Sequence, residues 1–268
     1  MRKISGFVLS IATFALLLQT SCVTAVDGQE DQDVEQVGEA DQEVIVDNAL
    51  TANALTANAL TANALTANAL TANALTANAL TANALTSNAL KDPKARQLLK
   101  YIVSCALDED AHINVTVNGQ VYGFDGELGL AKKWGKPNGK CDSECRTWVS
   151  GCVLSRVDYL GEPVDISIRG KHDALQSSWA ERVHFNKREA TYYGNIFAKP
   201  QQLYACLSPG KHQIPRVCGP NINNCFLDVV GHCDDLCKSP SADGSFPKCE
   251  DDQCHGDKHE GSVTVFLE

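Results

Sequence analysis

The chain has 268 residues, 12 cysteines and a formal net charge of -10, and 44% of its residues are hydrophobic. Acidic residues gather between Asp27 and Asp47, where no Lys or Arg occurs, and no basic patch of the kind that binds nucleic acid is present. We therefore expect no nucleic-acid partner. The acidic run is typical of a solvated, disordered segment.

The first 25 residues have the features of a signal peptide for export. Arg2 and Lys3 precede an apolar stretch, Gly6–Leu18, that is too short to span a bilayer. Cys22 then stands where a bacterial lipoprotein signal carries its acylated cysteine, although the preceding Gln-Thr-Ser is an imperfect lipobox. Ordinary cleavage after Ala25 is the alternative. We favour lipidation of Cys22, which predicts an outer-membrane or cell-surface lipoprotein, and otherwise a periplasmic or secreted protein.

Residues 26–47 form the predicted acidic tether, and residues 48–90 repeat the triplet Asn-Ala-Leu nine times at a spacing of five. A five-residue step does not keep the leucines on one face of either a helix or a strand. The repeat resembles the pentapeptide-repeat family, but the two positions before Leu are swapped, and its length gives only about two coils of a square solenoid. We predict a spacer, with a short solenoid or an irregular helix as alternatives.

The segment 91–205 is predicted to be an α+β domain that opens with a helix and a hairpin. Asp92 and Pro93 are typical of a helix N-cap and first turn. Apolar residues then recur at helical spacing over Leu98–Leu107. Alternating apolar residues on both sides of Asn118-Gly119 predict a β-hairpin.

A second helix and several strands follow. The stretch 141–162 is predicted to be helical, with Ser143 as its cap, Gly161 as its stop, and Trp148, Cys152 and Val157 on one buried face. The predicted strands are Pro163–Gly170, with Val164, Ile166 and Ile168 on one side, then strands within Ala190–Leu207, and Gly261–Glu268. These elements predict two or more helices packed on a small, mainly antiparallel sheet.

Eleven cysteines follow Cys22, and residues 206–268 form a cysteine-rich extension with few apolar residues. Export to an oxidising compartment favours disulfides, and a segment that cannot build its own core depends on about three of them. The odd number leaves at least one cysteine free, intermolecular or ligating. The disulfide candidates are Cys105, Cys141, Cys145, Cys152, Cys206, Cys218, Cys225, Cys233, Cys237, Cys249 and Cys254.

Spacing suggests some pairs without fixing the connectivity. Cys105 and Cys152 both lie on apolar helix faces, so we expect them to join the two helices. The other expected pairs are local in sequence: Cys141 with Cys145, Cys233 with Cys237, and Cys249 with Cys254.

Four residues near the C-terminus form the strongest metal-site candidate: Cys249, Cys254, His255 and His259. Two thiols and two imidazoles suit zinc. Adjacent Cys254 and His255 rarely both bind one ion, however, and export favours a disulfide. The Cys-x4-Cys-His spacing is also a variant of a haem attachment motif, whose usual spacing is two residues. We favour the disulfide interpretation and predict no cofactor.

The sequence assigns no catalytic residue. His172, Asp173, Glu181 and His184 have the types that general acid–base catalysis uses, but nothing in the sequence fixes their geometry. Nucleophile elbows, metalloprotease helices and phosphate loops are absent. Trp148, at helical spacing, is expected in the core rather than in a ligand groove.

The stretches YIVSCAL, GELGLAKKW, RTWVSGCVLSRVDYLGEPVDISIRG and YYGNIF resemble motifs in a group of uncharacterised, cysteine-rich lipoproteins of myxobacteria. Some members also carry a NALTA-type repeat after the signal. The resemblance covers most of residues 91–206 and the repeat. It implies a location and an architecture but no activity, cofactor or catalytic residue.

These features predict a lipid-anchored protein of the cell envelope with a disulfide-stapled binding or structural domain. Its expected partners are the membrane, through the lipid, and an unidentified protein or envelope polymer. Two alternatives remain open. One is an extracytoplasmic enzyme of an unrecognised type, and the other is a metal or redox module on the C-terminal Cys/His cluster.

Overall fold

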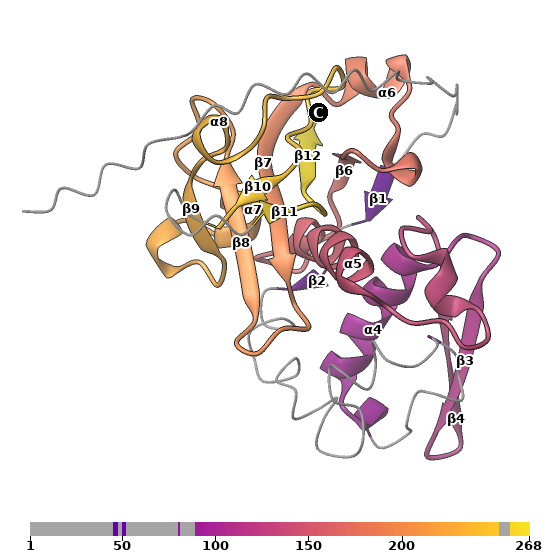
Figure 1. The fold of residues 1–268 in the computed structure, drawn as a ribbon. Coiled ribbons are helices and arrows are strands. Elements are labelled where there is room, and N and C mark those ends of the chain that lie inside the picture. The colour runs from indigo at the N-terminus through magenta and orange to yellow at the C-terminus, as the bar shows by residue number, and fades with distance from the viewer. Residues whose placement is uncertain (1–44, 48–49, 52–79, 81–88, 252–257) are drawn as a thin grey trace, which may run out of the picture. The chain divides into compact units, whose positions relative to one another are not determined.

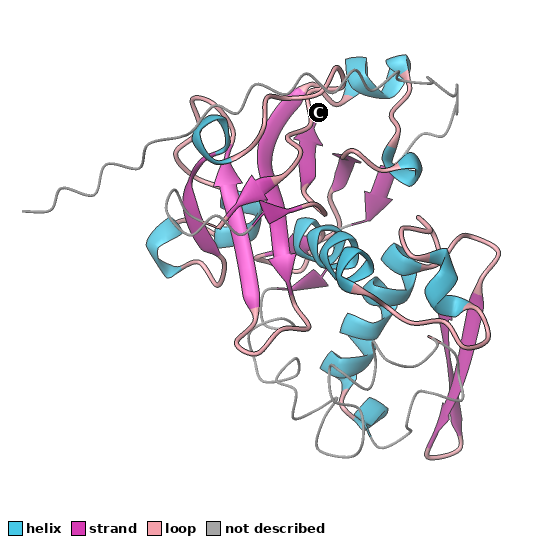
Figure 2. Cartoon of the chain, viewed as in Figure 1, coloured by secondary structure: helices cyan, strands magenta, loops and turns pink. Residues whose placement is uncertain are grey.

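The computed structural model confirms the α+β class (Figure 1, Figure 2). The structure describes residues 45–47, 50–51, 80, 89–251 and 258–268. The chain divides into two units, Met1–Gln36 and Val37–Glu268, and every described residue belongs to the second. The predicted signal peptide with Cys22, most of the tether and most of the repeat lie outside the described residues.

A six-stranded sheet forms one layer of the fold, in the order β1-β6-β12-β7-β8-β9. Neighbouring strands are antiparallel except β8 and β9, which are parallel. The C-terminal strand lies inside the sheet, and its Val263 and Val265 are fully buried. The bounds are β1 Ile45–Asp47, β6 Asp165–Arg169, β7 Lys187–Asn195, β8 Gln202–Leu207, β9 Asp228–His232 and β12 Val263–Leu267.

Two long helices, α4 (Pro93–Ala106) and α5 (Ser143–Ser155), pack beside this sheet. Figure 1 shows α5 between the sheet and α4. Asp92 caps α4 as predicted, because its carboxylate accepts a hydrogen bond from the Lys94 amide at 2.9 Å. Asp142, and not the predicted Ser143, caps α5, since its carboxylate accepts from the Cys145 amide at 2.9 Å.

The second helix ends earlier than predicted. It stops at Ser155, and Val157–Asp158 forms β5, which pairs in parallel with β2 (Leu50–Thr51). Contacts distant in sequence hold the chain there. The Arg216 side chain donates to the Val157 carbonyl at 2.7 Å, and the Tyr159 amide donates to the Arg216 carbonyl at 2.7 Å. Val157 is buried as predicted, but from a strand.

The predicted hairpin forms from β3 (His112–Val117) and β4 (Gln120–Asp125). Asn118 and Gly119 make its two-residue turn with φ values of 52° and 83°, in the left-handed region that a type I′ turn requires. The alternate apolar side chains of β3 are buried, and β4 packs against α4.

The strand predicted at Pro163–Gly170 is shorter than expected. Ile166 and Ile168 are fully buried in β6, but Val164 lies before the strand and is 38% exposed. The predicted stretch Ala190–Leu207 divides into β7 and β8, which pair antiparallel.

Some residues before position 91 also belong to the folded unit. β1 pairs with β6 at the edge of the sheet, and β2 pairs with β5. Leu80 of the repeat is 1% exposed, and its amide donates to the Trp134 carbonyl at 2.9 Å. Leu90 is fully buried. The fold therefore begins before the predicted boundary at residue 91.

Nine short elements complete the described structure, and five of them lie in the cysteine-rich extension. They are η2 Ala89–Lys91, η3 Lys132–Gly135, η4 Asp173–Leu175, α6 Trp179–His184, α7 Pro215–Cys218, η5 Ile222–Asn224, α8 Cys233–Leu236, β10 Cys249–Glu250 and β11 Lys258–His259. Such short pieces cannot be stable by themselves, so tertiary contacts and disulfides must hold them.

Five disulfides lie in the described part of the chain. Cys105–Cys152 joins α4 to α5, and Cys141–Cys145 closes the start of α5. The expected pairs of Cys233 with Cys237 and of Cys249 with Cys254 are wrong. The observed pairs are Cys206–Cys233, Cys218–Cys225 and Cys237–Cys249. The parallel pairing of β8 with β9 explains the first of these, because it brings the end of β8 beside the start of α8.

A buried ion pair joins β7 to α7. Arg216 Nη2 lies 2.6 Å from Glu189 Oε2, and the two side chains are 6% and 5% exposed. The Tyr192 hydroxyl donates to the same carboxylate at 2.9 Å. Burial raises the pKa of Tyr192 well above its usual value, so this hydroxyl stays protonated and keeps its role as a donor.

Candidate functional site

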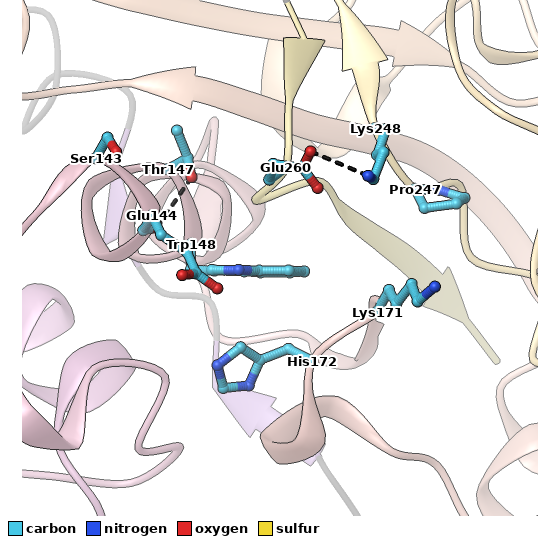
Figure 3. Close-up of a pocket in the computed structure, with 9 residues that line it drawn as sticks. All are labelled: Ser143, Glu144, Thr147, Trp148, Lys171, His172, Pro247, Lys248 and Glu260. Carbon is cyan, nitrogen blue, oxygen red and sulfur yellow. Dashed lines mark hydrogen bonds and ion pairs between the residues drawn. The ribbon is translucent and has the colours of Figure 1, made fainter. Parts of the chain in front are cut away.

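A cleft of about 510 Å³ opens beside the first turns of α5. Four stretches of chain form its walls: the start of α5, the segment after β6, the residues before β10, and the turn after β11 (Figure 3). The lining residues are Ser143, Glu144, Thr147, Trp148, Lys171, His172, Pro247, Lys248 and Glu260. The volume falls within the range of about 300–1,000 Å³ typical of small-molecule sites.

The apolar part of the cleft comes from Trp148 and Pro247. Trp148 is only 4% exposed, so most of its ring belongs to the core, as predicted, and little of it is accessible from the cleft. The His172 ring packs against it edge to face, with centroids 5.0 Å apart. The Trp148 ring therefore offers little accessible surface on which a ring of a ligand could stack.

Two glycines hold the wall of the cleft in place. A Cβ on Gly261 would lie 2.2 Å from the Thr147 carbonyl carbon, and one on Gly151 would lie 2.5 Å from the Gly261 carbonyl oxygen. Only glycine permits α5 and the chain before β12 to approach so closely. This approach places Glu260 at the rim, where its carboxylate pairs with Lys248 at 3.1 Å.

His172 is fixed by hydrogen bonds to both sides. Its Nδ1 accepts from the Ala174 amide at 3.1 Å, and the ring also bonds the Leu130 carbonyl. Burial lowers the pKa of His172 below its usual value, so the imidazole is neutral at pH 7. With both nitrogens engaged, the ring is a wall of the cleft rather than a free general base.

Charges of both signs face the cleft. Within the described part of the chain, neither the Lys171 ammonium nor the Glu144 carboxylate has a hydrogen bond or ion pair, and both side chains are exposed. Lys248 and Glu260 add one paired charge of each sign. The formal charges of the lining residues therefore cancel. The cleft offers donors and acceptors together, without favouring an anion or a cation.

The other predicted acid–base candidates do not meet in this cleft. Glu181 is fully buried and accepts a hydrogen bond from the Ser167 hydroxyl. His184 lies 3.1 Å from Glu268, but the two side chains are 59% and 61% exposed. Asp173 is an exposed residue at the start of η4. The structure places His172 alone, of these four, in the cleft.

The structure brings two of the predicted metal ligands together, since Cys249 of β10 pairs with His259 of β11. Cys249 is bonded to Cys237 and offers no thiolate to a metal. His259 is 6% exposed, and its ring lies 5.6 Å from the rings of both Tyr193 and Tyr204. Cys254 and His255 lie outside the described residues. The predicted zinc site therefore lacks Cys249 as a ligand, because this cysteine is oxidised in a disulfide.

Three sulfur atoms do come together elsewhere. The Sγ atoms of Cys206, Cys233 and Cys237 lie within 4.8 Å of one another, although each cysteine belongs to a disulfide.

No helix in the described ranges is long and apolar enough to cross a membrane. The predicted lipidation site, Cys22, lies outside those ranges.

Comparison with protein-family models, with curated proteins and with solved structures finds no match for this chain.

Proposed function

We propose that this chain is an exported protein of the cell envelope, anchored by a lipid on Cys22, whose disulfide-stapled domain binds a hydroxyl-rich envelope polymer in the α5 cleft. The residues that line the cleft support the binding part of this proposal. The export-like N-terminus and the five disulfides support the location, since disulfides persist in oxidising compartments.

A hydroxyl group matches the chemistry of the cleft. It donates one hydrogen bond and accepts others, so neighbouring hydroxyls on one ligand can bind both Lys171 and Glu144. A ligand with a single charge would be attracted by one of these groups and repelled by the other. A neutral saccharide satisfies both, and its CH groups can cover the apolar edge of Trp148 and Pro247.

Binding is favoured over catalysis because of the state of His172. A general base needs a free lone pair within reach of the substrate, and both nitrogens of this ring already have partners. The remaining groups of the cleft are suited to hydrogen bonding and positioning.

Removing the anchor should release the protein from membranes. We expect Cys22→Ala to move the chain from the membrane fraction to the soluble fraction, because the acyl chains supply the membrane affinity. Fractionation followed by immunoblotting measures this. A Lys211→Ala variant, which changes an exposed residue and keeps the anchor, serves as a control and should stay with the membranes. Retention of the Cys22→Ala chain there would refute the anchor.

Changing the unpaired charges should weaken polymer binding. Lys171→Ala and Glu144→Ala each remove a hydrogen bond to a charged group, worth about 1.5–3 kcal/mol, so each should weaken binding about tenfold or more. Co-sedimentation with insoluble polysaccharide from the cell envelope measures this. Lys211→Ala, at an exposed lysine outside the cleft, is the matched control. If all three variants bind equally, the cleft is not the binding site.

A further inference from the structure

Two disulfides lie against each other near the end of β8. One is Cys206–Cys233 and the other is Cys237–Cys249. The Sγ atoms of Cys206 and Cys237, which belong to different disulfides, are 3.6 Å apart. Cys249 is not part of the group of sulfurs that lie within 4.8 Å of one another. The close contact therefore runs through Cys237.

The four cysteines differ in their access to solvent. Cys206, Cys233 and Cys249 are completely buried, whereas Cys237 is partly exposed. Tyr193, Leu236 and Phe246 belong to the same buried cluster and cover the other three sulfurs. A thiol in solution can thus reach Cys237 first, while the Cys206–Cys233 bond is shielded from direct attack.

We propose that these paired disulfides form a thiol–disulfide exchange site for an external dithiol, with Cys237 as the entry point and Cys206 as its internal target. Exchange requires a thiolate to contact a disulfide sulfur. The 3.6 Å contact gives Cys237 this position as soon as its own bond to Cys249 is opened.

The reaction balances in three steps. A thiolate of the dithiol attacks Cys237 Sγ, the Cys237–Cys249 bond breaks, and Cys249 leaves as a thiolate that takes up a proton. The second thiol of the reagent then attacks the mixed disulfide, so that the reagent becomes a cyclic disulfide and Cys237 is released as a thiolate. Cys237 then attacks Cys206, the Cys206–Cys233 bond breaks, and Cys233 leaves and is protonated.

The net result is one oxidised dithiol and a protein that has gained two electrons and two protons. The new bond, Cys206–Cys237, still ties β8 to the chain after α8. Cys249 becomes free, so β10 loses its covalent tie. Lys248 of the cleft directly precedes Cys249, and exchange therefore also frees one rim of the cleft from its covalent tie.

Two single variants of the full chain test the role of Cys237. Cys249→Ala and Cys237→Ala both remove the same disulfide, but only the first leaves the sulfur that contacts Cys206. After acid quenching, alkylation with N-ethylmaleimide and digestion before aspartate residues, peptide mass mapping locates the label. Asp234 and Asp235 stand between Cys233 and Cys237, so this digestion separates them.

The expected labels concern the four cysteines of the paired disulfides. For Cys249→Ala we expect two isomers: one labelled on Cys237, and one labelled on Cys233 with a Cys206–Cys237 bond. For Cys237→Ala we expect label on Cys249 and on neither Cys206 nor Cys233. Label on Cys237 alone in the Cys249→Ala chain would overturn the proposal, and so would label on Cys206 or Cys233 in the Cys237→Ala chain. An intact Cys105–Cys152 bond in each sample shows that the variant has folded.

The unaltered protein provides the second test, which does not depend on how the variants fold. Brief treatment with one equivalent of dithiothreitol should give molecules labelled on Cys233 and Cys249 with a Cys206–Cys237 bond. Molecules labelled only on Cys237 and Cys249, with Cys206–Cys233 intact, would show that reduction stops at the first disulfide and would overturn the proposal.

Discussion

Replacing both Cys105 and Cys152 with alanine is expected to lower the free energy of unfolding by about 4 kcal/mol, because this disulfide closes a long loop and restricts the unfolded chain. The two cysteines are 47 residues apart in sequence, and both are fully buried where α4 meets α5. Urea unfolding of the oxidised proteins, followed by circular dichroism, gives the difference between the variant and the unaltered chain.

The disulfide at the start of α5 provides the matched control. Cys141 and Cys145 are only four residues apart, so the same chain-entropy argument gives about 2 kcal/mol for the double alanine variant. We therefore expect the Cys105/Cys152 double alanine variant to be less stable than the Cys141/Cys145 double alanine variant. Equal losses would show that loop closure is not what the long-range disulfide contributes.

The variant Glu189→Ala is expected to cost about 3–5 kcal/mol, the usual loss when one partner of a buried ion pair is removed. The remaining Arg216 guanidinium is 6% exposed and would be left as an uncompensated charge, beside a Tyr192 hydroxyl that has lost its acceptor. Urea unfolding at pH 7 measures the loss.

A second arginine pair with a more exposed acid tests this reasoning. Arg156 Nη2 lies 2.9 Å from Glu127 Oε2, but the Glu127 side chain is 39% exposed. The Arg156 side chain is only 4% exposed, but water can take the place of the partly exposed carboxylate beside it, so Glu127→Ala should cost less than Glu189→Ala. A loss for Glu127→Ala as large as that for Glu189→Ala would contradict the explanation by burial.

Local sequence signals predicted the elements that depend on neighbouring residues. The cap at Asp92, the turn at Asn118-Gly119 and the alternation in β3 all act within a few residues, so composition and spacing are enough to identify them. The facing of Cys105 and Cys152 could also be predicted, because each lies on the apolar face of a long helix.

Features that depend on contacts between distant residues could not be predicted from local spacing. Val157 continues a helical pattern in the sequence, but it lies in a strand and its carbonyl accepts a hydrogen bond from Arg216, 59 residues away. Cys206 is bonded to Cys233 because the pairing of β8 with β9 brings the two together, and not because they are close in sequence. Local spacing favours near neighbours, so it misassigned Cys233 and Cys237.

The cleft could not be predicted either, apart from His172 as an isolated candidate. In the sequence, nothing distinguishes Lys171, Lys248 and Glu260 from ordinary surface charges. They line the cleft with Glu144 because the sheet brings the end of β6 and the chain before β12 to the start of α5. The one local signal is Gly261, a small residue directly before the C-terminal strand, where the chain passes against Thr147.

The most direct test of the proposed export, lipid anchor and disulfides is the intact mass of the chain purified from its own membrane fraction, measured before and after reduction and alkylation. The account predicts a chain that starts at Cys22 and carries acyl groups, with ten of its eleven other cysteines oxidised. A chain that starts at Val26 without acyl groups, or one with a bound metal or with Cys105 and Cys152 reduced, would contradict it.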